Sequence, residues 1–247
     1  MLPTELEPVS ARGWPATQSD SLGDWRLYAS RGISGRLNTC WALGAPDRPV
    51  QEAIDAVEAW YAARGFAPRF KLIVEDTSVD LASLLSARGY QPDRPTLTMV
   101  GPLAAGGDSD VALLGEPNAN YCVVFADAAF GHADDAAERL EALAQTPTPR
   151  AFALLRQDGV PAAVGACVVE GDFAGVVGMR TAPAFRRRGL ARRVFRSLTD
   201  FARAAGASQG YLQVEESNGS AVALYRSEGF QTAYAYSHWL RRSPAPL

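Results

Sequence analysis

The sequence predicts an α/β fold, in which helices flank a mixed central sheet. Three apolar runs between residues 151 and 181 are separated by short turns, one of them an Asp-Gly pair, and this is typical of antiparallel strands. Residues 188–205 keep apolar side chains at helical spacing between strand-like runs at 173–181 and 209–215, which predicts a parallel strand pair joined by a helix. Residues 37–90 repeat the order strand, helix, strand, helix.

Each element of the second half has a local signal. Pro183 cannot donate to a sheet ladder and marks a strand end, while Gly206 and Gly229 follow helical runs, where a C-terminal glycine is favoured. The expected elements are a helix at 133–144, strands at 151–156, 160–170 and 173–181, a helix at 188–205, a strand at 209–215, a helix at 220–226 and a strand at 230–240.

The first half is punctuated in a similar way. Residues 1–22 are polar and contain prolines, which predicts an irregular lead-in, and the glycine-rich run at 101–110 predicts a linker. Strands are expected at 37–43, 69–75 and 96–100, with helices at 49–64 and 79–88. The predicted organisation is a lead-in at 1–22, a first domain at 23–103, a linker at 104–110 and a second domain at 111–247.

Composition excludes several classes of protein. A hydrophobic content of 47% is ample for a core, and a net charge of −3 gives no general affinity for nucleic acid. The 3 cysteines are widely spaced and neither His132 nor His238 has ligand neighbours, so we expect no disulfide framework and no metal. No apolar run reaches the ~18 residues typical of a membrane span, and the first residues do not resemble a signal peptide. We therefore expect a soluble, cytoplasmic protein.

The most informative segment is a basic turn between a strand and a helix. It contains the pattern Arg186-x-x-Gly189-x-Ala191, with three adjacent arginines. The glycine lets backbone N–H groups approach a ligand, and the helix that follows directs its unpaired N–H groups and positive dipole end to the same place. This arrangement predicts a site for a pyrophosphate or a similar anion.

A second pattern follows in the right order. Residues 218–230 read N-x-x-A-x-x-L-Y-x-x-x-G-F, from Asn218 to Phe230. Together the two patterns resemble the GNAT family of acyl-CoA-dependent N-acetyltransferases, over about residues 150–240. The resemblance implies the GNAT acyl-CoA N-acyltransferase fold, and acetyl-CoA as the co-substrate with no metal.

The resemblance also implies which residues contact the cofactor. The strand end from Met179 to Thr181 would pair with pantetheine through its backbone, and the turn from Arg186 would hold the pyrophosphate. Asn218 would contact the cofactor or help to place it; the alternative is a helix N-cap, which an asparagine forms well, and the two roles are compatible. The alternative interpretation of Arg192 is an ordinary exposed helix residue. The implied set is Met179, Arg180, Thr181, Arg186, Arg187, Arg188, Gly189, Leu190, Ala191, Arg192, Asn218 and Tyr225.

Acetylation of an amine needs a proton acceptor for the amine and a proton donor for the leaving thiolate. Tyr225 occupies the position of the family's general acid, and its alternative is a half-buried core tyrosine. The strand at 173–181, where the family often has a glutamate, contains no carboxylate. Glu215 is therefore our first candidate for the base, before Glu216. It could instead bind a cationic substrate or be a solvated strand end.

The first half resembles a degenerate second GNAT-like unit. Gly65 and Gly89 are 24 residues apart, while Gly206 and Gly229 are 23 apart. However, the turn after Gly44 lacks a further glycine and contains Asp47, and Leu85 stands where the second half has a tyrosine. We therefore expect the first half not to bind acyl-CoA.

The sequence thus predicts an acetyl-CoA-dependent N-acetyltransferase that acts by direct transfer in a ternary complex. The acceptor is expected to be a primary amine on a small molecule or a peptide, and the enzyme a monomer or homodimer without nucleic-acid or membrane partners. A non-catalytic acyl-CoA-binding or regulatory protein on the same fold is the alternative.

Overall fold

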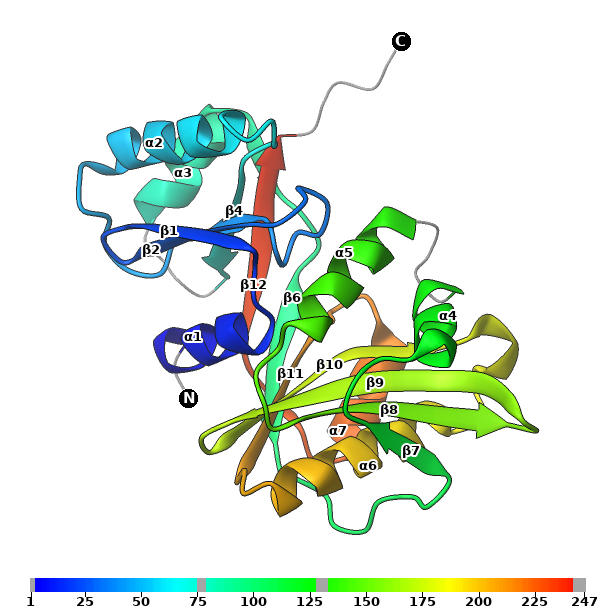
Figure 1. The fold of residues 1–247 in the computed structure, drawn as a ribbon. Coiled ribbons are helices and arrows are strands. Elements are labelled where there is room, and N and C mark those ends of the chain that lie inside the picture. The colour runs from blue at the N-terminus through cyan, green and yellow to red at the C-terminus, as the bar shows by residue number, and fades with distance from the viewer. Residues whose placement is uncertain (1–2, 75–78, 128–132, 242–247) are drawn as a thin grey trace.

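The computed structural model describes residues 3–74, 79–127 and 133–241. Its strands form one 12-stranded mixed sheet, in the order β1-β2-β3-β4-β12-β6-β11-β10-β9-β8-β7, with β5 paired to β12. The expected α/β class with a mixed sheet flanked by helices is confirmed (Figure 1). No helix in the described ranges is long and apolar enough to cross a lipid bilayer.

The first half begins with a helix that the sequence did not lead us to expect. The irregular lead-in predicted for residues 1–22 is wrong for Pro3–Gly13 and for Gln18–Leu22, which form α1 and β1. The helix is held by contacts to residues far away in the chain, which a local pattern does not record. The further elements are β2 Trp25–Ala29, β3 Thr39–Trp41, α2 Val50–Ala62, β4 Arg69–Ile73, α3 Val79–Ala87, β5 Tyr90–Pro92 and β6 Thr96–Gly101.

The second half follows the predicted order closely. Two elements at its start were not predicted, namely β7 Val111–Leu114 and α4 Ala119–Asp127. The others are α5 Ala133–Ala144, β8 Arg150–Gln157, β9 Val160–Glu170, β10 Phe173–Thr181, a 3₁₀ turn at Pro183–Phe185, α6 Leu190–Ala204, β11 Gln209–Glu215, α7 Gly219–Ser227 and β12 Gln231–Arg241.

The two halves exchange strands. β6, from the first half, lies between β12 and β11, while β12, the last strand of the chain, pairs with β4 and β5 of the first half. The sheet is therefore continuous across both halves. The domain boundaries at 103 and 111 stay a prediction.

Each half also contains one parallel strand pair joined by a helix. β10 pairs in parallel with β11 across α6, as predicted, and β3 pairs in parallel with β4 across α2. The helix α6 ends as expected, because Gly206 follows it with a φ of 98°. The repeated order agrees with two related units, although a common GNAT origin for the first half stays a prediction.

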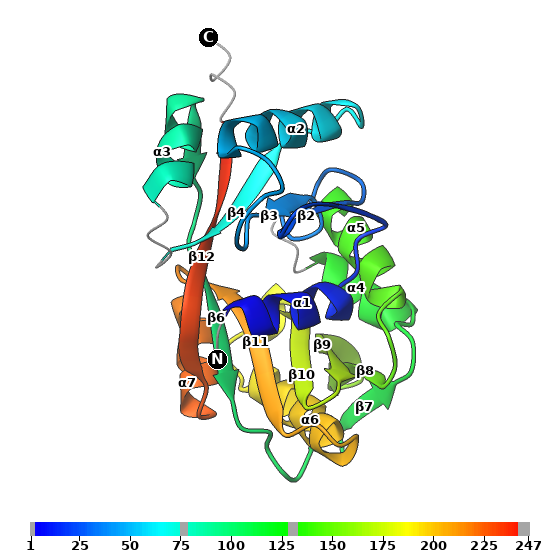
Figure 2. The same ribbon diagram turned by 90° about the vertical axis from the view of Figure 1, so that its left-hand side faces the viewer.

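The helices cover the sheet in two layers. Alternate residues of β12 face opposite sides: Tyr234 packs with Leu6 of α1, whereas Ala235 belongs to the core cluster of Leu198 in α6. By the same alternation, α2, α3, α6 and α7 cover one face, and α1, α4 and α5 cover the other. Figure 2 shows α1 between the two halves, on the side away from α6.

Candidate active site

The parallel strands β10 and β11 separate toward their C-terminal ends. Their pairing begins at Phe173 with Gln209 and ends at Gly175 with Tyr211. Both strands continue beyond this point, β10 to Thr181 and β11 to Glu215. The edge of β10 that faces β11 is thus left without a strand partner over its last six residues. Such an edge offers backbone hydrogen bonds to an extended ligand.

A bulge reshapes β10 within this unpaired stretch. The register with β9 shifts between Val177 and Arg180, and Gly178 has a φ of 62°, which favours glycine. After the bulge, Met179 packs against Gly165 on the α6 side, while the guanidinium of Arg180 lies 5.1 Å from the ring of Phe125 in α4. The two side chains are thus directed to opposite faces, and contact with a ligand in the gap is left to the backbone.

The basic turn leads from this strand end to the N-terminus of α6. Arg187 has a φ of 64° and Gly189, the N-cap of α6, has a φ of 77° with no side-chain capping bond. A Cβ built on Gly189 would meet nothing within 4 Å. The first N–H groups of α6, at Leu190 and Ala191, therefore border open space with the positive end of the helix dipole behind them.

The arginines of this segment fall into two groups. The side chains of Arg192 and Arg193 are held by neighbours: Arg192 Nε is 3.0 Å from Glu228 Oε1, and Arg193 pairs with Asp108 and Asp110. By contrast, Arg187 and Arg188 are exposed and form no ion pair within the described residues. The guanidinium groups of these two residues are therefore accessible to an anionic ligand.

Arg186 and Leu190 have different positions again. The exposed Arg186 donates from Nε to the carbonyl of Thr181 at 3.2 Å, which ties the turn to the end of β10. The side chain of Leu190 is buried in the core, so this residue has only backbone groups to offer.

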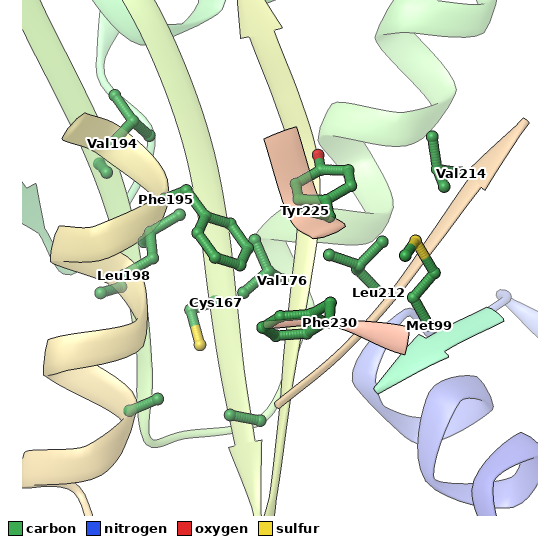
Figure 3. Close-up of a cluster of buried hydrophobic side chains, with 14 of the residues drawn as sticks. Met99, Cys167, Val176, Val194, Phe195, Leu198, Leu212, Val214, Tyr225 and Phe230 are labelled. Atoms are coloured by element: carbon green, nitrogen blue, oxygen red, sulfur yellow. The ribbon is translucent and has the colours of Figure 1, made fainter. Parts of the chain in front are cut away.

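Tyr225 of α7 is almost fully buried beside the gap. Its ring lies 5.2 Å from that of Phe195, in the cluster that also holds Val176 of β10 and Leu212 of β11. Figure 3 shows its hydroxyl on the side of the ring away from Phe230. Burial raises the pKa of Tyr225 to about 12. The phenol is therefore protonated at neutral pH. The described part of the chain provides no hydrogen-bond partner for the hydroxyl, which is thus free to donate.

Asn218 lies at the start of the same helix. Its Oδ1 accepts the backbone N–H of Ala221 at 3.3 Å and the hydroxyl of Ser220 at 3.2 Å. The N-cap interpretation of Asn218 is therefore confirmed.

Glu215 lies on the other side of β11 from Tyr225. Leu212 and Val214 share the cluster of Tyr225, so by strand alternation Glu215 faces the α1 side. Its side chain is half exposed, and Oε2 lies 3.4 Å from Nη1 of Arg94. The structure thus places the two candidate proton-transfer residues on opposite faces of the sheet.

Comparison with known proteins decides the family. Residues 4–239 match the family described as "Probable histone acetyltransferase Rv0428c C-terminal". The chain belongs to this acetyltransferase family. The uncharacterized N-acetyltransferase YobR of Bacillus subtilis is 24% identical over 262 residues, covering 96% of this chain and 98% of that protein. N-alpha-acetyltransferase RimI of Mycobacterium tuberculosis is 44% identical over 63 residues, which are 26% of this chain and 38% of that protein.

Solved structures agree on the fold. A GCN5-related N-acetyltransferase from Kribbella flavida matches with a TM-score of 0.73 at 18% identity, covering 98% of this chain and 96% of that chain. The GNAT resemblance of the sequence is thereby confirmed, and this member of the acetyltransferase family is an acyltransferase.

Sequence reasoning missed the polar residues that this acetyltransferase carries on the α1 face. The ammonium group of Lys71, the chain's single lysine, forms an ion pair with Glu7, and Tyr234 donates to the same carboxylate at 2.8 Å. Arg36, Arg69 and His238 lie further along this face. One signal was present: Lys71 interrupts an apolar strand, whereas nothing local distinguishes Glu7.

No metal ligand set is evident in the described ranges, because no three His, Cys, Asp or Glu side chains cluster there. His132 lies outside these ranges. Cys167 is buried near the gap, and burial raises the pKa of its thiol to about 12. A nucleophilic role for Cys167 is therefore disfavoured, since the reactive form of a cysteine is the thiolate.

Proposed function

We propose that the enzyme transfers the acetyl group of acetyl-CoA to a primary amine, with both substrates bound together at the gap between β10 and β11. The observation that carries this proposal is the end of the strand pairing at Gly175 and Tyr211, in a strand that leads through the basic turn to the N-terminus of α6. The gap offers an extended pantetheine chain the same backbone partners that an added strand would have.

The pyrophosphate would lie over the basic turn. The N–H groups from Gly189 to Ala191 would donate to its oxygens, with the helix dipole favouring its charge. The side chains of Arg187 and Arg188 would reach its outer oxygens. The backbone from Met179 to Thr181 would hold the pantetheine, which agrees with the side chains of Met179 and Arg180 being directed to the two faces of the sheet.

The chain's own groups would then support the acyl transfer. N–H groups at the bulge around Gly178 would polarise the thioester carbonyl, as donors in an oxyanion hole do. Tyr225 would donate to the sulfur as the bond breaks. Its pKa of about 12 lies above the ~8.5 of a free thiol. We therefore expect the phenol to act first as a hydrogen-bond donor to the developing thiolate.

Direct transfer is favoured over a covalent enzyme intermediate. The thiol nearest to the gap, Cys167, is buried and protonated. The amine would approach from the face of the sheet opposite to Tyr225. On that face, Glu215 is our candidate to accept the proton of the amine, directly or through a water molecule. The acceptor would be a small molecule or a peptide, and the enzyme a monomer or homodimer in the cytoplasm.

The first half would not bind a second cofactor. Its parallel strands stay together, because Cys40 and Trp41 pair with β4 and the N–H of Ala42 reaches the carbonyl of Lys71 at 3.4 Å. The turn that follows is already occupied by a carboxylate: Oδ2 of Asp24 accepts the N–H of Ala45 at 3.2 Å.

Release of free thiol from acetyl-CoA, measured with a panel of primary amines, tests the proposal. Initial rates that intersect when both substrates are varied are expected for a ternary complex, whereas parallel lines would indicate a covalent intermediate. An enzyme that neither binds acetyl-CoA in calorimetry nor acetylates any amine would contradict the proposed function.

A further inference from the structure

A cluster of basic side chains lies on the α1 face of the sheet, between the two halves. We call Arg36, Arg69, Arg139 and His238 the basic cluster. A Cβ built on Gly35 would lie 3.2 Å from Nη1 of Arg69 and 3.4 Å from the ring of His238. The guanidinium carbons of Arg36 and Arg139 lie 5.1 and 5.9 Å from the centroid of one ring, that of Trp14. One turn and three elements thus bring these side chains to one place, and all four side chains are half-buried.

The charges of this cluster are only partly balanced by the chain, since Asp93, Glu138 and Asp135 act on Arg69 without forming an ion pair with it. Arg139 is paired with Asp135 at 2.7 Å. Arg36 and Arg69 form no ion pair with any described residue. The one hydrogen bond that Arg69 donates to the described chain goes to the carbonyl of Asn38, at 3.3 Å.

The nearest buried carboxylate is not available to these arginines. Glu138 accepts the backbone N–H groups of Arg31 and Ser34 and the side-chain amide of Asn38. Burial lowers the pKa of Arg69, which means that its charge is held in an unfavourable environment. A half-buried guanidinium without a direct ion-pair partner is a group that an anion would stabilise.

Neighbouring polar atoms also lack partners. Within the described ranges, Nε1 of Trp14, Nε2 of Gln213 and Nε2 of His238 are buried without a hydrogen bond. Folded proteins keep few such atoms, and each calls for an explanation such as a ligand. The indole and amide groups are N–H donors, which match an acceptor oxygen.

The cluster adjoins the proposed reaction site. Gln213 lies on β11 two residues before Glu215, on the same face of the strand. Arg180, just after the bulge of β10, is near enough to Arg139 for the two charges to influence each other. The cluster therefore borders the gap on the side opposite Tyr225, where an acceptor could meet the thioester without crossing the cofactor.

From this placement we propose that the acceptor is a small amine that carries an anionic group, a carboxylate or a phosphate, which binds to Arg36 and Arg69. This proposal rests on the proposed transferase function and names its substrate class. The N–H groups of Gln213 and Trp14 would donate to the anionic oxygens, and the amine would point to the gap beside Glu215. Planar guanidinium groups suit both oxyanions, since each offers paired N–H donors. A lysine-rich peptide would meet like charge here.

Matched pairs of acceptors test the substrate class. The common L-amino acids are compared with their amides, and phosphoethanolamine with ethanolamine, so that the two arms separate carboxylate from phosphate. We expect kcat/KM to be at least about tenfold higher for the charged member of one pair. The amides have the more acidic ammonium group and so more reactive amine near neutral pH, hence reactivity alone would give the opposite order. Equal rates within every pair, or a preference for a lysine-rich peptide, would overturn the proposal.

Variants connect the preference to the cluster. Arg36→Gln and Arg69→Gln are each expected to raise KM for the charged amine at least about tenfold, while kcat/KM for its uncharged partner and the affinity for acetyl-CoA stay unchanged. Arg31→Gln is the matched control, because Arg31 lies in the same loop but is exposed and paired with Glu141. If Arg69→Gln fails to fold, Arg36→Gln carries the test alone, since Arg36 makes no hydrogen bond to the described chain. If a variant lowered kcat/KM equally for both members of a pair, the role of the arginines would be structural.

A binding measurement separates this proposal from the proposed function. Calorimetry with N-acetylglycine and with O-phosphoethanolamine needs no turnover. Binding by the wild type that Arg36→Gln weakens at least about tenfold supports the cluster as an anion site. If neither probe binds, or if the variant binds as the wild type does, the substrate class is wrong even when acetyl-CoA binds and other amines are acetylated.

Discussion

The ammonium group of Lys71 and the carboxylate of Glu7 form an ion pair in which both side chains are almost wholly buried, with exposed fractions of 2% and 0%. The ammonium group also lies 4.1 Å from the ring centroid of Trp41 and 3.9 Å from that of Tyr236. Since Glu7 belongs to α1 and Lys71 to β4, the pair fixes the first helix of the chain to the sheet where the two halves meet.

The first prediction concerns this pair. Glu7→Gln would leave Lys71 charged and buried without a counter-charge, and breaking such a pair typically costs ~3–5 kcal/mol. We expect the free energy of unfolding of the variant, measured with urea, to be lower than that of the wild type by this amount. Glu52→Gln, at an exposed position of α2, is the control and should change the free energy of unfolding by less than about 0.5 kcal/mol. A loss in Glu7→Gln no larger than the control's would mean that the pair contributes nothing to holding α1.

The same pair explains why the sequence did not predict α1. The helix has a proline inside it and little local apolar pattern, so its sequence favours a loop. Its stability comes from partners far along the chain, among them Tyr234, which is 227 residues from Glu7. The exchange of β6 and β12 was not predicted for the same reason, because the local periodicity of a strand does not indicate which strand it pairs with.

The turn and helix on the proposed cofactor side could be predicted, and the cluster on the proposed acceptor side could not. The basic turn and α6 are formed by residues that are close in the sequence, such as Arg186 and Gly189. A short sequence pattern is therefore enough to predict them. The proposed acceptor side is assembled from several elements, as Arg69 in β4 and His238 in β12 illustrate. No spacing in the sequence brings these side chains together.

The second prediction places the pyrophosphate over Gly189. Gly189→Glu would put a carboxylate into the open space above the turn, and two like charges ~4 Å apart repel by ~4 kcal/mol at a protein surface. We expect acetyl-CoA binding to be abolished in calorimetry. Gly159→Glu is a matched control for backbone strain, since its φ of 79° is close to the 77° of Gly189 and it also faces open space. Unchanged affinity in a folded Gly189→Glu would remove the turn from the cofactor site.

The third prediction is that one acetyl-CoA binds per chain. The strands of the first half stay paired through Trp41, and Asp24 already accepts an N–H of the turn where a second pyrophosphate would bind. A calorimetric titration should therefore saturate at one equivalent. Two equivalent sites would show that the first half is a working cofactor unit.

The fourth prediction concerns pH. The phenol of Tyr225 acts only when protonated, and burial raises its pKa from 10.0 to about 12. The donor is therefore lost as pH rises through about 12, and an unperturbed tyrosine would already be lost near ~10. At saturating amine, we expect kcat to show no falling limb between about pH 9 and about pH 11. A limb centred near ~10 would mean that the tyrosine is solvated in the working enzyme, or that another group is titrating.

The last prediction tests Tyr225 as the proton donor. Tyr225→Phe keeps the ring that packs at 5.2 Å from Phe195, and the lost hydroxyl has no hydrogen-bond partner in the described chain, so the variant should fold with near wild-type stability. The phenol matters mainly as the thiolate leaves, hence kcat should fall while KM for acetyl-CoA changes little. General acid catalysis contributes ~10²–10⁴-fold, so a fall of at least about tenfold is expected. Tyr61→Phe is the control, because the Tyr61 hydroxyl donates to the carbonyl of Tyr28 at 2.8 Å inside the first half: it should lower stability and leave kcat unchanged. Wild-type turnover in Tyr225→Phe, under conditions where chemistry limits the rate, would make Tyr225 a core residue and leave protonation of the thiolate to water or to another group.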